Sequence, residues 1–232
     1  MTLKLITFDL DDTLWPIEPV LTHAEGEFYT YLRSQEPETF ARISADDLRQ
    51  HRVQVLSQQP ELKHNVSLWR RESLRQLLAE QSLPEDRIDN LVAQAFSVFL
   101  NARQQVRLFD GAQECIEELA SRYQLIALTN GNANIKQMPI GRYFSEAIRA
   151  EDIGRSKPEP DMFERALEIA ECQAHESLHI GDDPYYDIAP AQALGMQSLR
   201  AAITDKHPPD ESSFSHWREL PALIDGLDEH AR

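Results

Sequence analysis

Cysteine is scarce in this chain of 232 residues, which contains only Cys115 and Cys172. Both fall in predicted helices, and neither has a second cysteine or a histidine at the spacing of metal ligands. The sequence therefore lacks the pattern of a cysteine-based metal site. We expect both thiols to be reduced and buried.

Long apolar runs and an excess of positive charge are also missing. No stretch approaches the roughly 18 consecutive apolar residues of a membrane span, and residues 1–8 are too short for the apolar core of a secretory signal. We therefore expect a cytoplasmic protein with no membrane partner. Lysine and arginine number 23 against 39 acidic residues, and the resulting net charge of −16 argues against a nucleic acid as partner.

The remaining composition is that of an ordinary soluble globular protein, with 41% hydrophobic and 27% charged residues. A chain of this length can form one large domain or a domain with a substantial insertion. We expect a monomer or a weak dimer.

Three carboxylates follow the first apolar segment of the chain. Residues 3–8 form a short run broken by only two polar residues, which is typical of a buried parallel strand. Asp9, Asp11 and Asp12 come directly after it. Because ligands of open α/β sheets bind at the carboxyl ends of the strands, these side chains are candidates for a functional site.

Residues 17–105 show helical periodicity and little strand character. Ser44 and Asp47 form the pattern of a capping box, Ser67 is the predicted N-cap of the next helix, and apolar residues recur at helical spacing over 88–99. We predict that this segment is a helical bundle, a cap domain inserted into an α/β domain.

Strands and helices alternate from residue 106 onward. This rhythm predicts a doubly wound parallel sheet in a Rossmann-like α/β domain made of residues 1–16 and 106–232. The predicted strands are 124–128, 147–149, 177–180 and 196–200. Residues 187–194 are predicted to be a helix, 206–215 a loop and 220–227 a last helix.

Polar residues follow two further predicted strands. Thr129, Asn130 and Gly131 come after the strand 124–128. Asp182 comes directly after the strand 177–180. The ends of parallel strands meet at one edge of a sheet, so we expect these residues to lie near Asp9.

Six aspartates would crowd this edge: Asp9, Asp11, Asp12, Asp182, Asp183 and Asp187. Two such charges about 4 Å apart repel by roughly 4 kcal/mol at an effective dielectric near 20. Lys157, in a loop that can reach the same place, is too little to offset this repulsion. Carboxylate oxygens suit Mg²⁺, and we predict a Mg²⁺ site.

The order of these motifs resembles a known family. Asp9-x-Asp11-Asp12-Thr13 after an N-terminal strand, followed by Thr129, Lys157 and Gly181-Asp182, is similar to the haloacid dehalogenase-like (HAD) hydrolase superfamily, in the group with a helical cap after the first motif. The segments 128–133, 154–158 and 179–183 resemble bacterial capped HAD phosphatases of flavin metabolism. These enzymes hydrolyse FMN and the ribitylaminouracil phosphate precursor of riboflavin.

The resemblance implies a catalytic role for several residues. Asp9 would be the nucleophile that forms an aspartyl-phosphate, and Asp11 would be the general acid and then the general base. Thr129 and backbone amides near Asn130 and Gly131 would hold the phosphate oxygens, and Lys157 would neutralise both the phosphate and the nucleophile. Dehalogenases of the family lack the second aspartate because halide leaves without a proton, so Asp11 favours hydrolysis of a phosphate ester.

The resemblance also implies a set of metal ligands. Asp9, Asp11 and Asp182 would bind Mg²⁺, with Asp183 and Asp187 among the ligands or just beyond them. The spacing from Asp182 to Asp187 is one residue longer than in many relatives, which leaves the role of Asp187 open.

Substrate choice is less well defined. His64, Trp69 and Arg70 form a polar and aromatic cluster that would select the leaving group, or would have ordinary surface and core roles. Tyr185 and Tyr186 would wall the pocket or simply pack. We expect a small phosphate ester as substrate; a sugar-phosphate or nucleotide phosphatase of the same superfamily is one alternative, and a receiver-type phosphoacceptor module is another.

Overall fold

The computed structural model describes residues 3–204 and 206–230. The chain divides into two compact units, one made of Met1–Ile17 with Val106–Arg232 and the other of Glu18–Gln105. Ile17, predicted to begin the inserted domain, therefore groups with the first unit.

The first unit is built on a six-stranded sheet in which every pairing is parallel. Its strands are β1 (Leu5–Phe8), β2 (Gln124–Thr129), β3 (Glu146–Arg149), β4 (Ser177–Gly181), β5 (Gln197–Ala201) and β6 (Ser213–Phe214). They lie in the order β3-β2-β1-β4-β5-β6. The first strand of the chain is thus flanked by β2 and β4, and its four residues are all buried.

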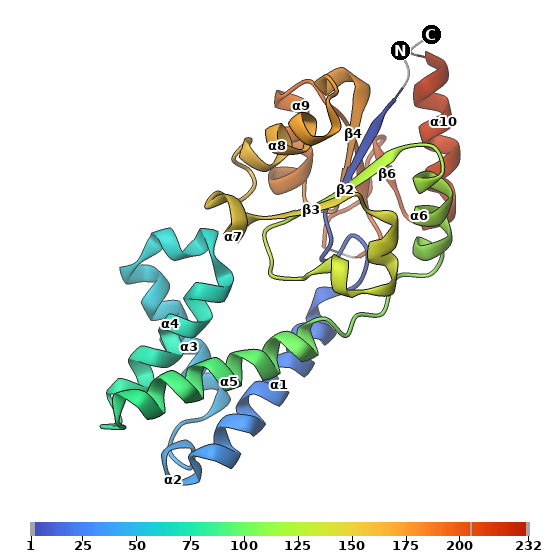
Figure 1. Cartoon of the computed structure of the whole chain (residues 1–232). Coiled ribbons are helices and arrows are strands. Elements are labelled where there is room, and N and C mark those ends of the chain that lie inside the picture. Colours follow the sequence, from blue (N-terminus) through green and yellow to red (C-terminus); the bar gives the residue numbers. More distant parts are fainter. Residues whose placement is uncertain (1–2, 205, 231–232) are drawn as a thin grey trace. The chain divides into compact units, whose positions relative to one another are not determined.

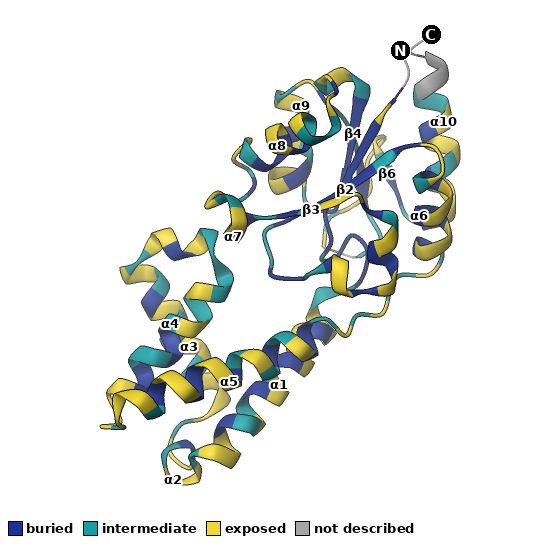
Figure 2. Cartoon of the chain, viewed as in Figure 1, coloured by how far each residue is buried: buried dark blue, intermediate teal, exposed yellow. Residues whose placement is uncertain are grey.

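Helices cover both faces of this sheet (Figure 1). α6 (Ala112–Ala120) and α10 (Leu220–His230) lie on one side, and α8 (Asp161–Ala170) and α9 (Ala189–Ala193) on the other; α7 (Ala150–Ile153) follows β3. Burial follows this layering, since the central strands are dark blue and the outer helix faces yellow in Figure 2. The predicted α/β fold with a doubly wound parallel sheet is confirmed.

The end of the chain differs from the prediction. Residues 206–215, predicted to be a loop, contain the two-residue strand β6, which pairs with β5 through Arg200 and Ala201. The segment is polar and short, so it carries no period-two pattern by which a strand could be recognised. Pairing with a neighbouring strand, rather than local sequence, makes it a strand.

The second unit contains only helices in its described residues. These are α1 (Ile17–Gln35), whose first residue belongs to the other unit, α2 (Pro37–Phe40), α3 (Ala45–Gln58), α4 (Val66–Ala79) and α5 (Glu85–Arg103), with a 3-10 helix at Pro60–His64. The capping box of Ser44 and Asp47 is present at the start of α3. Its core gathers apolar side chains from the predicted stripes, such as Phe28, Leu78 and Phe99.

The start of α4 corrects one predicted cap. Asn65, not Ser67, is the N-cap, and its side-chain oxygen accepts a hydrogen bond from the Leu68 N–H at 2.8 Å. Asparagine and serine are both good N-caps, so composition alone did not decide between them.

Two predictions drawn from absences can be compared with the structure. Cys115 and Cys172 are free and buried, as expected. Among the described residues, no helix combines the length and the apolar character needed to cross a bilayer.

Candidate active site

The ends of the three central strands bring the predicted site together. Asp9 follows β1 directly, Asp182 follows β4 directly, and Thr129 is the last residue of β2. They border a cavity of about 310 Å³. Its lining consists of Asp9, Asp11, Asp12, Thr129, Asn130, Gly131, Lys157, Asp182, Asp183, Tyr186, Asp187 and Lys206.

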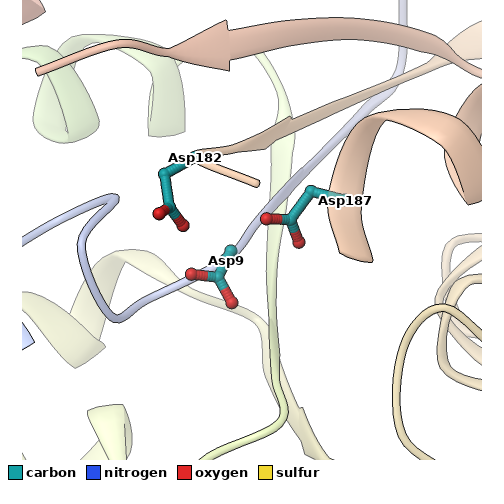
Figure 3. Close-up of side chains that lie close together, drawn as sticks. All are labelled: Asp9, Asp182 and Asp187. Carbon is teal, nitrogen blue, oxygen red and sulfur yellow. The ribbon is translucent and has the colours of Figure 1, made fainter. Parts of the chain in front are cut away.

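Three of these carboxylates point toward one another (Figure 3). Asp9, Asp182 and Asp187 each offer an oxygen within 4.8 Å of the other two, and all three are buried. At that separation each ionised pair repels by roughly 3 kcal/mol or more at an effective dielectric near 20. The cluster therefore needs a cation to hold its charge.

Lys157 supplies part of that positive charge. Its Nζ donates to Asp9 Oδ1 at 2.7 Å, to the Leu128 carbonyl at 3.1 Å and to Asp187 Oδ1, and only 2% of the side chain is exposed. All three ammonium hydrogens thus have acceptors. Lys157 is held between the predicted nucleophile and the last aspartate of the cluster.

Asn130 holds the backbone of Lys157 in place. Its Oδ1 accepts from the Lys157 N–H at 2.8 Å, and its Nδ2 donates to the Lys157 carbonyl at 3.0 Å. Both ends of the side-chain amide are therefore used within the protein. The main-chain N–H of Asn130, the group predicted to hold phosphate, takes no part in these two bonds.

Thr129 also has a partner nearby. The Gly131 N–H donates to Thr129 Oγ1 at 3.0 Å. The hydroxyl hydrogen of Thr129 is still available as a donor into the cavity, whereas the Gly131 amide is already engaged.

Asp187 is supported by two residues that the sequence did not reveal. His179, on β4, has its Nε2 3.3 Å from Asp187 Oδ1 and its Nδ1 2.8 Å from Thr7 Oγ1, and both residues are fully buried. A ring N–H directed at Asp187 leaves Nδ1 to accept from the Thr7 hydroxyl. The chain of contacts Thr7–His179–Asp187–Lys157–Asp9 thus runs from inside the sheet to the predicted nucleophile.

The remaining donors to Asp187 account for its place in the site. Its Oδ2 accepts from the Asp183 N–H at 3.0 Å, while Oδ1 is bound by Lys157 and His179. Gly181 lets this side chain approach, because a Cβ there would lie 2.3 Å from Asp187 Cγ. With both oxygens already bound, Asp187 is better suited to position Lys157 than to serve as a main metal ligand.

Asp183 has a local structural task. Its Oδ1 accepts from the N–H groups of Tyr185 and Tyr186, at 2.8 and 2.9 Å. These bonds begin a π-helical turn, Pro184–Ile188, ahead of α9, where a helix over 187–194 was predicted. The α-helix α9 therefore begins two residues later than predicted, at Ala189.

The loop after β1 orients its carboxylates through side-chain contacts. Trp15 Nε1 donates to Asp11 Oδ1 at 2.9 Å, and Thr13 Oγ1 lies 3.3 Å from Asp9 Oδ2. Asp12 has a φ of 60° and accepts from the Ile17 N–H at 2.9 Å. Asp11 is thus held at the cavity wall, whereas Asp12 shapes the turn.

Lys206 is a second cation that sequence reasoning missed. Its Nζ bonds Asp12 Oδ2 and lies 4.0 Å from Asp182 Oδ2. It comes from a polar loop with no motif around it, so only the folded chain brings it to the cavity.

The acid cluster perturbs the pKa values of its members. Burial raises the pKa of Asp9 well above its usual value, and Asp187 and Asp182 raise it further against the opposing effect of Lys157. Burial, together with Asp187, raises the pKa of Asp182 to about 7. Burial also opposes the charge of Asp187, but Lys157 and His179 outweigh it and lower its pKa. The raised pKa values of Asp9 and Asp182 show that, without a further cation, the cluster favours the protonated form of these two carboxyl groups.

This chemistry fits a hard divalent cation. Among the described residues, the carboxylate of Asp182 has no charged partner closer than Lys206, at 4.0 Å. Oxygen donors of this kind, together with an excess of negative charge, are what Mg²⁺ and similar ions prefer. The site is therefore suited to a divalent metal.

The three predicted specificity residues lie in the second unit. Trp69 Nε1 donates to the Arg52 carbonyl and Arg70 Nη1 to Glu25 Oε1, each at 2.7 Å. His64 ends the 3-10 helix. These contacts are internal to the bundle, and a role in substrate selection stays a prediction.

Comparison with known proteins gives the family. The haloacid dehalogenase-like hydrolase family matches residues 3–195, most of the chain and every residue of the central site except Lys206. The chain belongs to this family. The predicted family and the predicted class of enzyme are confirmed.

Two curated relatives of this HAD hydrolase are phosphatases. The chain is 33% identical to the 5-amino-6-(5-phospho-D-ribitylamino)uracil phosphatase YigB of Escherichia coli K12, over 84% of this chain and 82% of that protein. It is 26% identical to the ribulose-1,5-bisphosphate 5-phosphatase of Halopiger xanaduensis, over 97% and 96%.

A solved structure matches nearly the whole of this HAD hydrolase. It is described as a 2-haloacid dehalogenase from Pseudomonas syringae pv. tomato DC3000, is 34% identical and has a TM-score of 0.90. The match covers 97% of this chain and 99% of that one.

The Asp182 carboxyl gives a pH-dependent test of the acid cluster. Its pKa is higher in the folded protein than its usual 3.8, so the folded state holds this proton more tightly than the unfolded state does. The contribution of this proton to the free energy of unfolding is fully present below the usual pKa of 3.8 and is lost as pH rises toward about 7. With chelator present, the melting temperature of the wild type should fall more steeply between about pH 4 and pH 7 than that of Asp182→Asn. Parallel slopes would contradict the proposed repulsion.

The contact between Thr7 and His179 gives a test of the buried support for Asp187. His179→Leu leaves the Thr7 hydroxyl without its ring partner, and we expect the free energy of unfolding in urea to fall by about 1–3 kcal/mol. Thr7→Val with His179→Leu removes both partners and should cost less than the sum of the single variants. Strictly additive effects would show that the two side chains are not coupled.

Proposed function

We propose that this HAD hydrolase is a Mg²⁺-dependent phosphatase that cleaves phosphate monoesters of small metabolites. The proposal is carried by the contact of Lys157 Nζ with Asp9 Oδ1, at 2.7 Å, in a cavity that Asp11 also lines. Phosphoryl transfer needs a nucleophile in line with the leaving group, neutralisation of the phosphoryl oxygens and a proton for the leaving group. Asp9 is the nucleophile, Lys157 carries the neutralising charge, and Asp11 is the source of the proton.

The reaction proceeds in two displacements. Asp9 attacks phosphorus, and a bond from its carboxylate oxygen to phosphorus forms as the bond to the ester oxygen breaks. Asp11, oriented by Trp15, donates a proton to the departing alcohol. Water then attacks phosphorus and gives a proton to Asp11 as the bond to Asp9 breaks, which releases inorganic phosphate and restores both side chains.

The phosphate and the metal are held by the residues around these two. The Thr129 hydroxyl and the Asn130 N–H would donate to the phosphoryl oxygens, and the positive charge of Lys157 would offset their negative charge. Asp9, Asp182 and the carbonyl of Asp11 would hold Mg²⁺, which when bound neutralises the negative charge shared by carboxylates and phosphate. Asp187 accepts a hydrogen bond from the ammonium group of Lys157, and the Asp183 N–H donates to Asp187.

The substrate we propose is a ribitylaminouracil phosphate or FMN. The likeness to the E. coli ribitylaminouracil phosphatase over most of both chains supports this choice. A sugar phosphate is the alternative, supported by the likeness to the ribulose bisphosphate phosphatase. A small ester suits this acidic cavity of about 310 Å³ better than a nucleic acid does.

Dehalogenation is a second candidate, because the solved relative from P. syringae is described as a 2-haloacid dehalogenase. The acid Asp11, held at the cavity wall by Trp15, argues for phosphate esters, since a halide needs no proton to leave. Family membership in a hydrolase group also argues against a receiver-type signalling module.

Removal of Asp9 tests the proposed chemistry. Asp9→Asn should abolish phosphate release from FMN and from p-nitrophenyl phosphate, whereas Asp110→Asn, an exposed aspartate outside the cavity, should leave kcat unchanged. Asp11→Asn should lower kcat on FMN by about 10²-fold or more. It should lower kcat on p-nitrophenyl phosphate less, because p-nitrophenolate leaves readily without a proton.

The same assay decides between the candidates and tests the metal. Chelation with EDTA should stop phosphate release and Mg²⁺ should restore it. An Asp9→Asn variant that keeps a tenth or more of wild-type kcat would rule out Asp9 as nucleophile, and full activity in EDTA would rule out the metal. Chloride release from 2-chloropropionate without phosphate release from any ester would establish the dehalogenase.

A further inference from the structure

Two large aromatic side chains are exposed beside the metal-binding motif. Tyr185 is 63% and Tyr186 45% exposed, and Tyr186 lines the cavity that holds Asp9. Among the described residues around that cavity, Tyr186 is the only aromatic one. Aromatic rings left exposed at the wall of a binding site are suited to contact a ligand.

The backbone holds both tyrosines in fixed positions next to the site. Their N–H groups both donate to Asp183 Oδ1, and the Asp183 carbonyl accepts from the N–H groups of Asp187 and Ile188 at 3.0 and 3.3 Å. Asp183, the residue after Asp182, is therefore the N-cap of the π-helical turn. The turn buries Asp187 and leaves the side chains of Tyr185 and Tyr186 exposed.

The two rings also support each other. Their centroids lie 5.0 Å apart with an interplanar angle of 80°, an edge-to-face contact. Such contacts are favourable for aromatic pairs and restrict ring rotation. Tyr185 thus steadies Tyr186 at the wall of the cavity.

Charge limits what can lie against this wall. Six aspartates and two lysines line the cavity, so negative charge remains in excess. A bound divalent cation and a phosphate dianion would cancel each other and leave that excess in place. A second anionic group on the leaving alcohol would be repelled, whereas an uncharged planar group would not.

We propose that Tyr186, supported by Tyr185, is a specificity-determining residue that stacks on an uncharged, planar heteroaromatic part of the leaving group. The inference rests on the proposed phosphatase function and names the substrate class of the same site. The stacking contact supplies affinity for the alcohol part of the ester, which the charges of the cavity do not provide.

The test compares two phosphate esters that differ in the ring. FMN carries a planar ring on its sugar-alcohol chain, and ribose 5-phosphate has no aromatic ring. Tyr186→Ala should lower kcat/KM for FMN by about threefold to tenfold, the range for loss of an aromatic contact. The value for ribose 5-phosphate should stay within about twofold, since the phosphate contacts are unchanged.

Two further variants separate stacking from bulk. Tyr186→Phe keeps the ring and should retain wild-type preference for FMN, whereas Tyr186→Leu keeps apolar volume without the ring and should behave like Tyr186→Ala. Tyr185→Ala should give a smaller loss in the same direction. Melting temperatures close to wild type verify that each variant is folded.

A binding measurement provides a readout apart from turnover. Riboflavin, the alcohol product of FMN, should lose fluorescence on binding to the wild type and keep more of it with Tyr186→Ala. Equal loss of kcat/KM on both esters, or none on FMN, would overturn the stacking role while leaving the phosphatase standing. A wild-type protein that releases phosphate from neither ester in Mg²⁺ would instead overturn the function on which the inference rests.

Discussion

The buried ammonium group of Lys157 is the interaction on which the site depends. It bridges Asp9 and Asp187, two carboxylates that burial and mutual repulsion would otherwise drive apart or neutralise. Without it, burial and the neighbouring aspartates would raise the pKa of Asp9 further, which disfavours the ionised form that the proposed nucleophile needs. A buried charge of this kind is stable only when its partners hold it from every side, and here two carboxylates and a carbonyl do so.

Other residues of the first unit hold that ammonium group and its partners in position. Asn130 fixes the backbone of Lys157 by two hydrogen bonds, while His179 and Thr7 hold Asp187 from inside the sheet. These supports come from the central strands or directly after them, where the backbone is rigid. Rigid support matters because phosphoryl transfer gains most of its rate from positioning and fixed charge rather than from new covalent chemistry.

The proposed chemistry and the proposed substrate contact involve different residues. The residues proposed to act on phosphorus lie at the ends of β1, β2 and β4 and in the loop of Lys157. The aromatic pair lies on the π-helical turn after β4. Substitutions at the outward-facing positions of such a turn leave Asp182 and Asp187 in place. The preferred leaving group can therefore vary while the phosphate site is kept.

The sequence by itself determined the α/β class, the inserted helices and most of the acidic site. Apolar strands ending in Asp9, Thr129 and Asp182 have a local signal, and parallel strands bring such ends together. It did not reveal His179 and Thr7, which lie 172 positions apart, or Lys206 and the strand β6. Ser67 was mistaken for the cap that Asn65 provides, because both types cap well. Only the tertiary structure decided these points, since pairings between distant residues and unpatterned loops leave no periodic trace in the chain.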